Sequence, residues 1–111
     1  AGFISGLGYE ATVMMRSIPL RGFDLESAEK VCEGLQLHGT RVLRRVVPTR
    51  FEKKGDGVEV WFRDASSAEA QEQSEEYDTV ILAIGRNALS KQLNLDHVGV
   101  DVDPSSLKIV G

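Results

Sequence analysis

The order of strand-length and helix-length segments is the feature that most limits what this chain can fold into. Glu10–Met15 is an apolar run of strand length, and Asp24 is a good N-cap for a helix that continues to about His38. A second run rich in Val and Leu, Arg41–Val47, follows, and Pro48 is expected to break it or to mark a sheet edge. Strands that alternate with helices predict an α/β fold with a parallel sheet.

Later segments extend this predicted sheet. Thr49–Lys53 and Val58–Arg63 flank the turn sequence Gly55-Asp56-Gly57, which predicts an antiparallel hairpin as an excursion from the parallel sheet. The polar segment Asp64–Glu76 is expected to be a solvated loop or a weak edge. Val80–Ile84 is continuously apolar, which is typical of a parallel strand covered on both faces.

A glycine pattern near the start of the chain matches a dinucleotide-binding motif in its letters. The segment Gly6-Leu7-Gly8-Tyr9-Glu10-Ala11 fits G-x-G-x-x-A, which binds a pyrophosphate where it follows a strand and opens a helix. Here Ala1–Leu7 is expected to be the end of a helix, and a strand follows. We therefore expect these glycines to cap a helix and to allow close packing on the sheet.

Polar residues at the end of the first predicted strand form the candidate site. In a nucleotide-binding α/β unit, an acidic residue at this position binds the 2′-hydroxyl of NAD, and an arginine accommodates the 2′-phosphate of NADP. Arg16 and Ser17 stand at that strand end, and Arg21 lies in the same loop. A guanidinium group suits phosphate because its planar donors match the phosphate oxygens. The spacing alone fits two solvated loop arginines equally well.

Other reactive side chains are few. Cys32 is the single cysteine, so the chain holds neither an internal disulfide nor a C-x-x-C redox pair. Its position on the apolar stripe of a predicted helix indicates a buried structural thiol. His38 and His97 lie in no cluster with metal-ligand spacing. We predict no catalytic residue and no metal ligand in this chain.

Charge and hydropathy argue against two classes of partner. The net charge is −4 and no basic run is present, so nucleic-acid binding is not expected. The longest apolar run, Val80–Ile84, is far shorter than the roughly 20 residues that cross a membrane, so no membrane association is expected. No secretory signal peptide is visible at the start.

Several segments resemble animal thioredoxin reductases and thioredoxin-glutathione reductases, which belong to the pyridine nucleotide-disulfide oxidoreductases. The longest is Thr12–Asp24, which contains the arginines of the candidate site. Ala1–Gly8, Tyr77–Arg86 and Leu93–Val100 agree in the same order. The resemblance covers nearly the whole chain and is weakest from Lys53 to Glu76.

The resemblance implies an FAD-containing homodimer that moves electrons from NADPH to flavin and then to a disulfide, such as that of thioredoxin. It implies that Arg16 and Arg21, with Ser17, hold the 2′-phosphate of NADPH. It also places Gly85 and Arg86 at a strand end near the nicotinamide half of the cofactor, where a glycine lets backbone approach the ligand closely.

The resemblance also implies a domain organisation. Residues 1–90 would be an NADPH-binding, Rossmann-like domain that lacks its first strand, and residues 91–111 would begin the return into an FAD-binding domain. FAD would be bound mainly by regions outside this chain, which alone is expected to be inactive. The complete enzyme is expected in the cytoplasm or mitochondrion. A glutathione reductase-like enzyme and a non-catalytic nucleotide-binding module remain alternatives.

Overall fold

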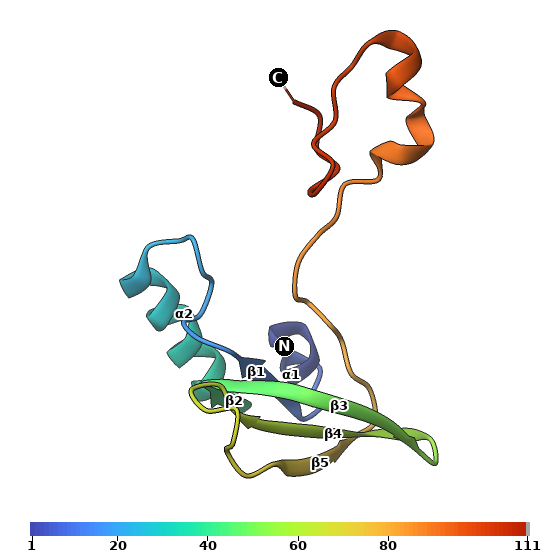
Figure 1. Ribbon diagram of the computed structural model, residues 1–111. Helices are drawn as coiled ribbons and strands as arrows, with labels where there is room; N and C mark the ends of the chain where they lie inside the picture. Colours follow the sequence, from blue (N-terminus) through green and yellow to red (C-terminus); the bar gives the residue numbers. More distant parts are fainter. Residues whose placement is uncertain (111) are drawn as a thin grey trace. The chain divides into compact units, whose positions relative to one another are not determined.

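The computed structural model describes residues 1–110 and shows short helices, two small sheets and a region of turns (Figure 1). Its elements, in chain order, are α1 (Gly2–Gly6), β1 (Ala11–Met15), α2 (Leu25–Leu37), β2 (Thr40–Arg44), β3 (Val46–Lys54), β4 (Gly57–Asp64), β5 (Gln73–Tyr77) and two 3₁₀ helices (Ser90–Leu93 and Leu95–Val98). The chain divides into two compact units, Ala1–Val80 and the residues from Ile81 onward. The sequence instead predicts a boundary between residues 90 and 91, where an NADPH-binding part would end and the return into an FAD-binding part would begin. That boundary stays a prediction.

Strand β1, helix α2 and strand β2 form a strand–helix–strand unit with a parallel sheet. The two strands run in register to their last residues, where Met15 pairs with Arg44. The side chain of Asp24 caps α2 by accepting a hydrogen bond of 2.9 Å from the backbone N–H of Ser27. After the helix, Gly39 has a φ of +87°, which lets the chain turn into β2. The α/β fold with a parallel sheet, expected from the sequence, is confirmed.

Strands β3, β4 and β5 form an antiparallel sheet in that order, with β4 in the middle. The hairpin expected around Gly55-Asp56-Gly57 is confirmed, because Lys54 pairs with Gly57 across the turn. Val60 and Phe62 on β4 are 2% and 4% exposed and form one part of the core. The segment expected to be a loop or a weak edge contains β5, which pairs with β4 as an edge strand.

One expected strand is two strands in the structure. The sequence predicts a single strand over Arg41–Val47, but Arg45, with a φ of +57°, separates β2 from β3. The left-handed backbone at Arg45 redirects the chain from the parallel sheet into the antiparallel one, and the carbonyl of Arg45 accepts a hydrogen bond of 2.7 Å from the N–H of Ala65. Pro48 lies inside β3, an edge strand, and the pairing register slips between Pro48 and Arg50.

The parallel strand expected at Val80–Ile84 is not formed, and this prediction is wrong. The segment is extended without strand pairing, and the side chains of Ile81, Leu82 and Ile84 are 77%, 60% and 89% exposed. An apolar run becomes a covered parallel strand only where neighbouring strands complete its hydrogen bonds. Within residues 1–110, β1 and β2 pair only with each other.

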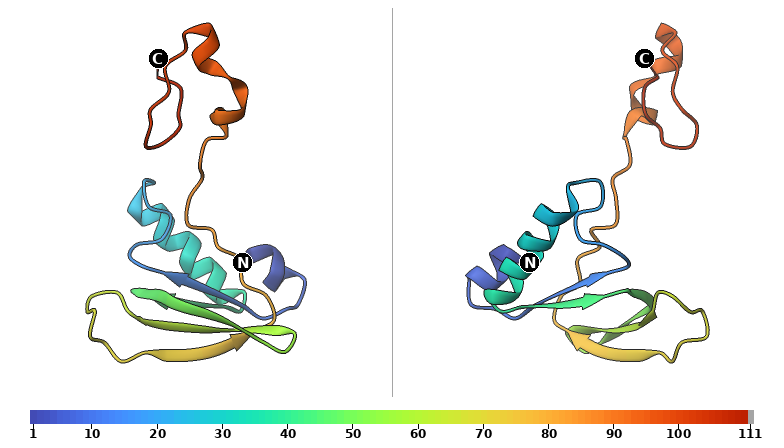
Figure 2. Two further views of the ribbon diagram at one scale, coloured as in Figure 1. Left: turned by 45° about the vertical axis from the view of Figure 1, so that its right-hand side comes forward. Right: turned by 90° about the vertical axis from the view of Figure 1, so that its left-hand side faces the viewer.

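In the first unit the helices, the parallel sheet and the antiparallel sheet follow one another, and ion pairs join them. Both views of Figure 2 show α1 and α2 on one side of β1 and β2, with the antiparallel sheet on the other side. Arg44 donates two hydrogen bonds, of 3.0 and 2.7 Å, to Glu29 of α2. Arg41 donates two, of 2.6 and 2.8 Å, to Glu75 of β5. Cys32 is 2% exposed, so the predicted buried thiol is confirmed.

The second unit is built from turns. Its two 3₁₀ helices are followed by a bridge between Val102 and Ile109, and the buried hydroxyl of Ser90 donates a hydrogen bond to the carbonyl of Leu107. In the described part of the chain, every helix falls short of the length and apolar character that a membrane span requires.

Candidate functional site

The carboxyl ends of β1 and β2 bring two arginines to one edge of the parallel sheet. Because Met15 pairs with Arg44, the next residues, Arg16 and Arg45, leave the sheet from adjacent strands. Neighbouring strands lie about 4.8 Å apart. Ligands of open α/β sheets bind outside the carboxyl ends of the strands, which is the edge where these arginines lie.

A cavity of about 330 Å³ lies at this edge, near the lower end of the roughly 300–1,000 Å³ range of small-molecule sites. Three connections that are far apart in sequence supply its walls. Its lining residues are Arg16, Ser17 and Ile18 after β1, Arg45 between β2 and β3, and Ala65 and Ser66 after β4. Two arginines and two serines are thus among the residues that line this cavity, beside Ile18 and Ala65. These residue types suit an anion attached to an organic group.

The two arginines of the cavity differ from three other arginines of the first unit, although Arg21 and Arg63 likewise form no ion pair within residues 1–110. Arg41, Arg44 and Arg50 each form an ion pair with a glutamate, at distances of 2.6, 2.7 and 2.9 Å. Neither Arg16 nor Arg45 forms an ion pair with any residue in the range 1–110. Because a guanidinium group stays protonated in proteins, both bring positive charge and donors to the cavity.

A turn after β4 holds Ser66, one of the lining residues, in place. One carboxylate oxygen of Asp64 accepts hydrogen bonds from the hydroxyl of Ser66 and from its backbone N–H, the latter at 2.7 Å. These two hydrogen bonds, and to a smaller extent the charge of Arg45, hold the pKa of Asp64 below its usual range. Asp64 is therefore a carboxylate at neutral pH and fixes the turn that faces Arg45.

Two of the predicted site residues meet in this cavity, and a third does not line it. Arg16 and Ser17 are exposed side chains at the end of β1 and both line the cavity. Arg21 lies farther along the same loop, exposed, between Leu20 with a φ of +42° and Gly22 with a φ of +101°. The role predicted for Arg21 therefore stays a prediction.

The other two predicted residues, Gly85 and Arg86, belong to the second unit. Both are exposed. Gly85 has a φ of +151°, a backbone angle that residues other than glycine rarely adopt. A Cβ added at this position would meet no heavy atom within 4 Å. The backbone thus accounts for a glycine at this position, while a contact with cofactor stays a prediction.

Two cavity residues, Arg45 and Ser66, were missed by the sequence reasoning. Arg45 was placed inside a continuous strand, where its side chain would point to one face of a sheet. The available signal was the pair Arg44-Arg45, because two consecutive charges interrupt an apolar run where a chain leaves a sheet. Ser66 lies in a polar loop and carried no signal of its own.

The glycine pattern Gly6-Leu7-Gly8-Tyr9-Glu10-Ala11 is not a pyrophosphate motif here. Helix α1 ends at Gly6, Gly8 has a φ of +87°, and β1 begins at Ala11, so these residues close a helix and enter a strand. The expected helix cap is therefore confirmed.

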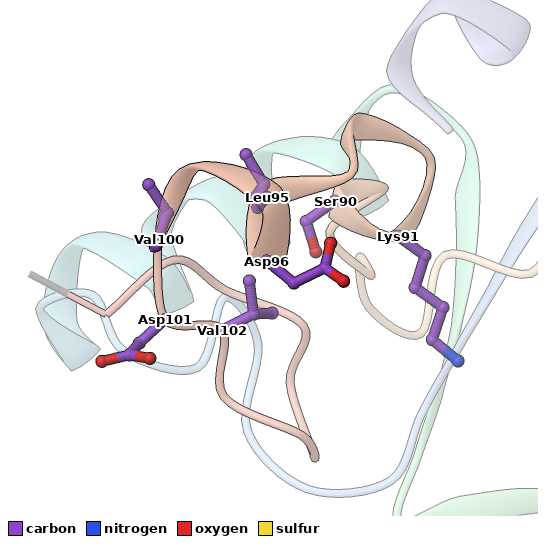
Figure 3. A pocket seen from close by; sticks show the side chains of 8 residues that line it. Ser90, Lys91, Leu95, Asp96, Val100, Asp101 and Val102 are labelled. Carbon is purple, nitrogen blue, oxygen red and sulfur yellow. The ribbon is translucent and has the colours of Figure 1, made fainter.

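A larger cavity, of about 450 Å³, lies within the second unit. Figure 3 shows its lining, where the carboxylates of Asp96 and Asp101 are present and the side chain of Lys91 extends away from Asp96. Two carboxylates repel an anion, so this cavity does not suit a phosphate. Within residues 1–110, the structure groups no three His, Cys, Asp or Glu side chains in a way that could hold a metal ion.

Comparison with known proteins identifies a family and relatives of this chain. The family model described as pyridine nucleotide-disulphide oxidoreductase matches residues 1–108. Thioredoxin reductase SEP1 from Emiliania huxleyi is 43% identical over 102 residues, which cover 90% of this chain and 20% of that protein. The chain thus spans about a fifth of the length of this curated relative.

Proposed function

Since the chain belongs to the pyridine nucleotide-disulphide oxidoreductase family and is thioredoxin reductase-like, we propose that it binds the adenosine end of NADPH. The proposed reaction of the whole protein is the transfer of electrons from NADPH through FAD to a protein disulfide. NADPH supplies the hydride in this chemistry. FAD is held mainly by regions outside this chain.

One observation carries the choice of NADPH over NADH. The cavity at the carboxyl end of β1 is lined by Arg16 and Ser17 and carries no carboxylate among its lining residues. NADPH differs from NADH by the 2′-phosphate on the adenine ribose, and an acidic residue at this strand end would favour the unphosphorylated ribose. A guanidinium group and a hydroxyl group both donate hydrogen bonds to phosphate oxygens.

Each side chain has a proposed task in binding. Arg16 and Ser17 hold the 2′-phosphate at the end of β1, and Arg21 adds a second guanidinium from the same loop. Gly85 allows the backbone to approach the nicotinamide half of the cofactor, and Arg86 lies beside it. This chain therefore contributes binding and orientation of the cofactor.

The substrate and assembly of the whole protein are also proposals. The printed name of the relative, thioredoxin reductase, supports thioredoxin or another protein disulfide as the electron acceptor. We propose a homodimer that works in the cytoplasm or the mitochondrion.

Kinetics of the complete protein test the proposed cofactor. Arg16→Ala and Arg21→Ala should each raise the KM for NADPH about tenfold or more and leave the use of NADH nearly unchanged. A hydrogen bond to a charged group contributes about 1.5–3 kcal/mol, and each 1.4 kcal/mol changes an equilibrium constant tenfold. Arg50→Ala, which removes an arginine outside the cavity, is the matched control. Equal losses with both cofactors would show that these arginines do not bind the 2′-phosphate.

A further inference from the structure

Arg45 is the one cavity arginine to which the sequence and the comparisons give no task. We infer that Arg45 is a phosphate-binding side chain of the same cavity and that it raises the preference for a ribose with a 2′-phosphate. This inference rests on the proposed function, because it names a further residue of the proposed NADPH site.

The register of the parallel sheet supports this assignment. Arg16 follows the last residue of β1, Arg45 follows the last residue of β2, and those last residues are paired. Both arginines line the same cavity of about 330 Å³. A phosphate held by Arg16 in this cavity therefore lies in a space that Arg45 also lines.

The backbone at Arg45 does not explain why an arginine is present. A φ of +57° suits glycine or asparagine, and an arginine adopts this conformation with strain. The side chain also forms no ion pair within residues 1–110. A strained backbone at a ligand cavity is a common mark of a functional residue. Binding of a ligand in the cavity would account for the arginine side chain, which no ion pair of the fold accounts for.

Charge balance favours a phosphate monoester as the ligand group. Such a group carries a charge of about −1.5 to −2 near pH 7. Arg16 is the one arginine of the β1 loop that lines the cavity, since Arg21 does not line it, and Arg45 brings a second positive charge from the end of the adjacent strand. The carboxylate of Asp64 accepts two hydrogen bonds from Ser66 and forms no ion pair with Arg45 within residues 1–110, although the charge of Arg45 contributes to the lowered pKa of Asp64.

The test uses the complete protein and two probes that differ only in the 2′-phosphate. Calorimetry measures the Kd of adenosine 2′,5′-bisphosphate and of adenosine 5′-monophosphate for wild type and for the variants Arg45→Gly, Arg45→Gln and Arg45→Lys. Glycine removes the side chain and meets the backbone demand at this position, so Arg45→Gly should keep the fold. Arg50→Gln is the control, because it removes an arginine that does not line the cavity.

We expect Arg45→Gly and Arg45→Gln to weaken binding of the bisphosphate about tenfold, and to change binding of the monophosphate less than about twofold. Arg45→Lys keeps the charge and loses the planar donor fork, so its loss should be smaller. Arg50→Gln should bind both probes as wild type does.

Arg16→Ala, measured beside these variants, separates the inference from the proposed function. If Arg16→Ala loses the preference for the bisphosphate and the Arg45 variants keep it, the inference is overturned and the proposed function stands. If Arg16→Ala also keeps the preference, both are overturned. Equal weakening of the two probes by Arg45→Gly would also overturn the inference, because the side chain would then act on something other than the 2′-phosphate.

Discussion

Arg44 and Arg45 are neighbours in sequence and have opposite surroundings. Arg44, the last residue of β2, faces α2 and forms two hydrogen bonds with Glu29. Arg45, one residue later, has left the sheet and lines the cavity. Residue type alone cannot distinguish them, because the distinction depends on where the strand ends and on the backbone angle at Arg45. Position relative to the sheet edge determines which arginine stabilises the fold and which is available to a ligand.

Cys32 gives a prediction at the residue scale. The thiol is 2% exposed on α2, and its sulfur lies 3.1 Å from a guanidinium nitrogen of Arg44. Cys32→Ala should leave the proposed disulfide reductase activity of the complete protein intact and lower its stability by about 1 kcal/mol, as small deletions in a core do. Activity assays and urea denaturation measure the two effects. Activity at background level in a folded variant would instead identify Cys32 as a redox residue.

Two glycines give a prediction at the scale of elements. A Cβ at Gly57, which starts β4, would lie 2.9 Å from the backbone oxygen of Tyr77, whereas a Cβ at Gly34 in α2 would meet nothing within 4 Å. Gly57→Ala should therefore destabilise by about 1–3 kcal/mol, because neighbouring backbone must move. Gly34→Ala should stabilise by up to about 1 kcal/mol, because alanine favours helix. Urea midpoints of both variants measure this contrast, and a shift of the same sign in both would contradict it.

Elements set by local sequence were predictable, and those set by distant partners were not. Asp24 and Gly39 mark the two ends of α2, and Gly55-Asp56-Gly57 marks the hairpin, so these were found. Val80–Ile84 has the composition of a covered strand, but composition does not supply a neighbour for its backbone. The same limit applies to β5, where the sequence predicts only a loop or a weak edge, because its polar residues form a strand through pairing with β4.

Some residues of the candidate site were likewise predictable from local sequence, and others were not. Arg16 and Ser17 were predictable because the position after a strand has a known role in nucleotide-binding units. Arg45 and Ser66 join them through the register of β1 and β2 and the turn after β4, which no local pattern reveals.

At the scale of the whole first unit, one cluster joins the two sheets. Arg41 of β2 donates to Glu75 of β5, and the hydroxyl of Tyr77 donates a hydrogen bond of 2.7 Å to the same carboxylate. Burial, together with the hydrogen bond to Glu75, raises the pKa of Tyr77 to about 12. The cluster therefore favours a neutral Tyr77.

This cluster predicts how stability changes at alkaline pH. Below pH 10 the phenol is neutral in the folded and unfolded states, and its contribution is fully present. Between pH 10 and about 12 the unfolded chain releases the proton first, so the free energy of unfolding falls. Tyr77→Phe should reduce the fall of the urea midpoint over this range, whereas Tyr9→Phe, at a 69% exposed residue, should not. Identical pH profiles for the two variants would contradict the assignment.

The irregular edge strand β3 has a consequence for how the protein behaves in a crowded solution. An edge strand presents free backbone groups that can template the addition of a strand from another chain, which is a route to aggregation. In β3 the register slips beside Pro48, a residue that has no N–H to offer, and Lys53 and Lys54 add like charges farther along. A second copy approaching this edge would meet an interrupted hydrogen-bonding ladder near Pro48. The same proline that makes β3 an imperfect strand thus helps to keep neighbouring molecules from joining their sheets.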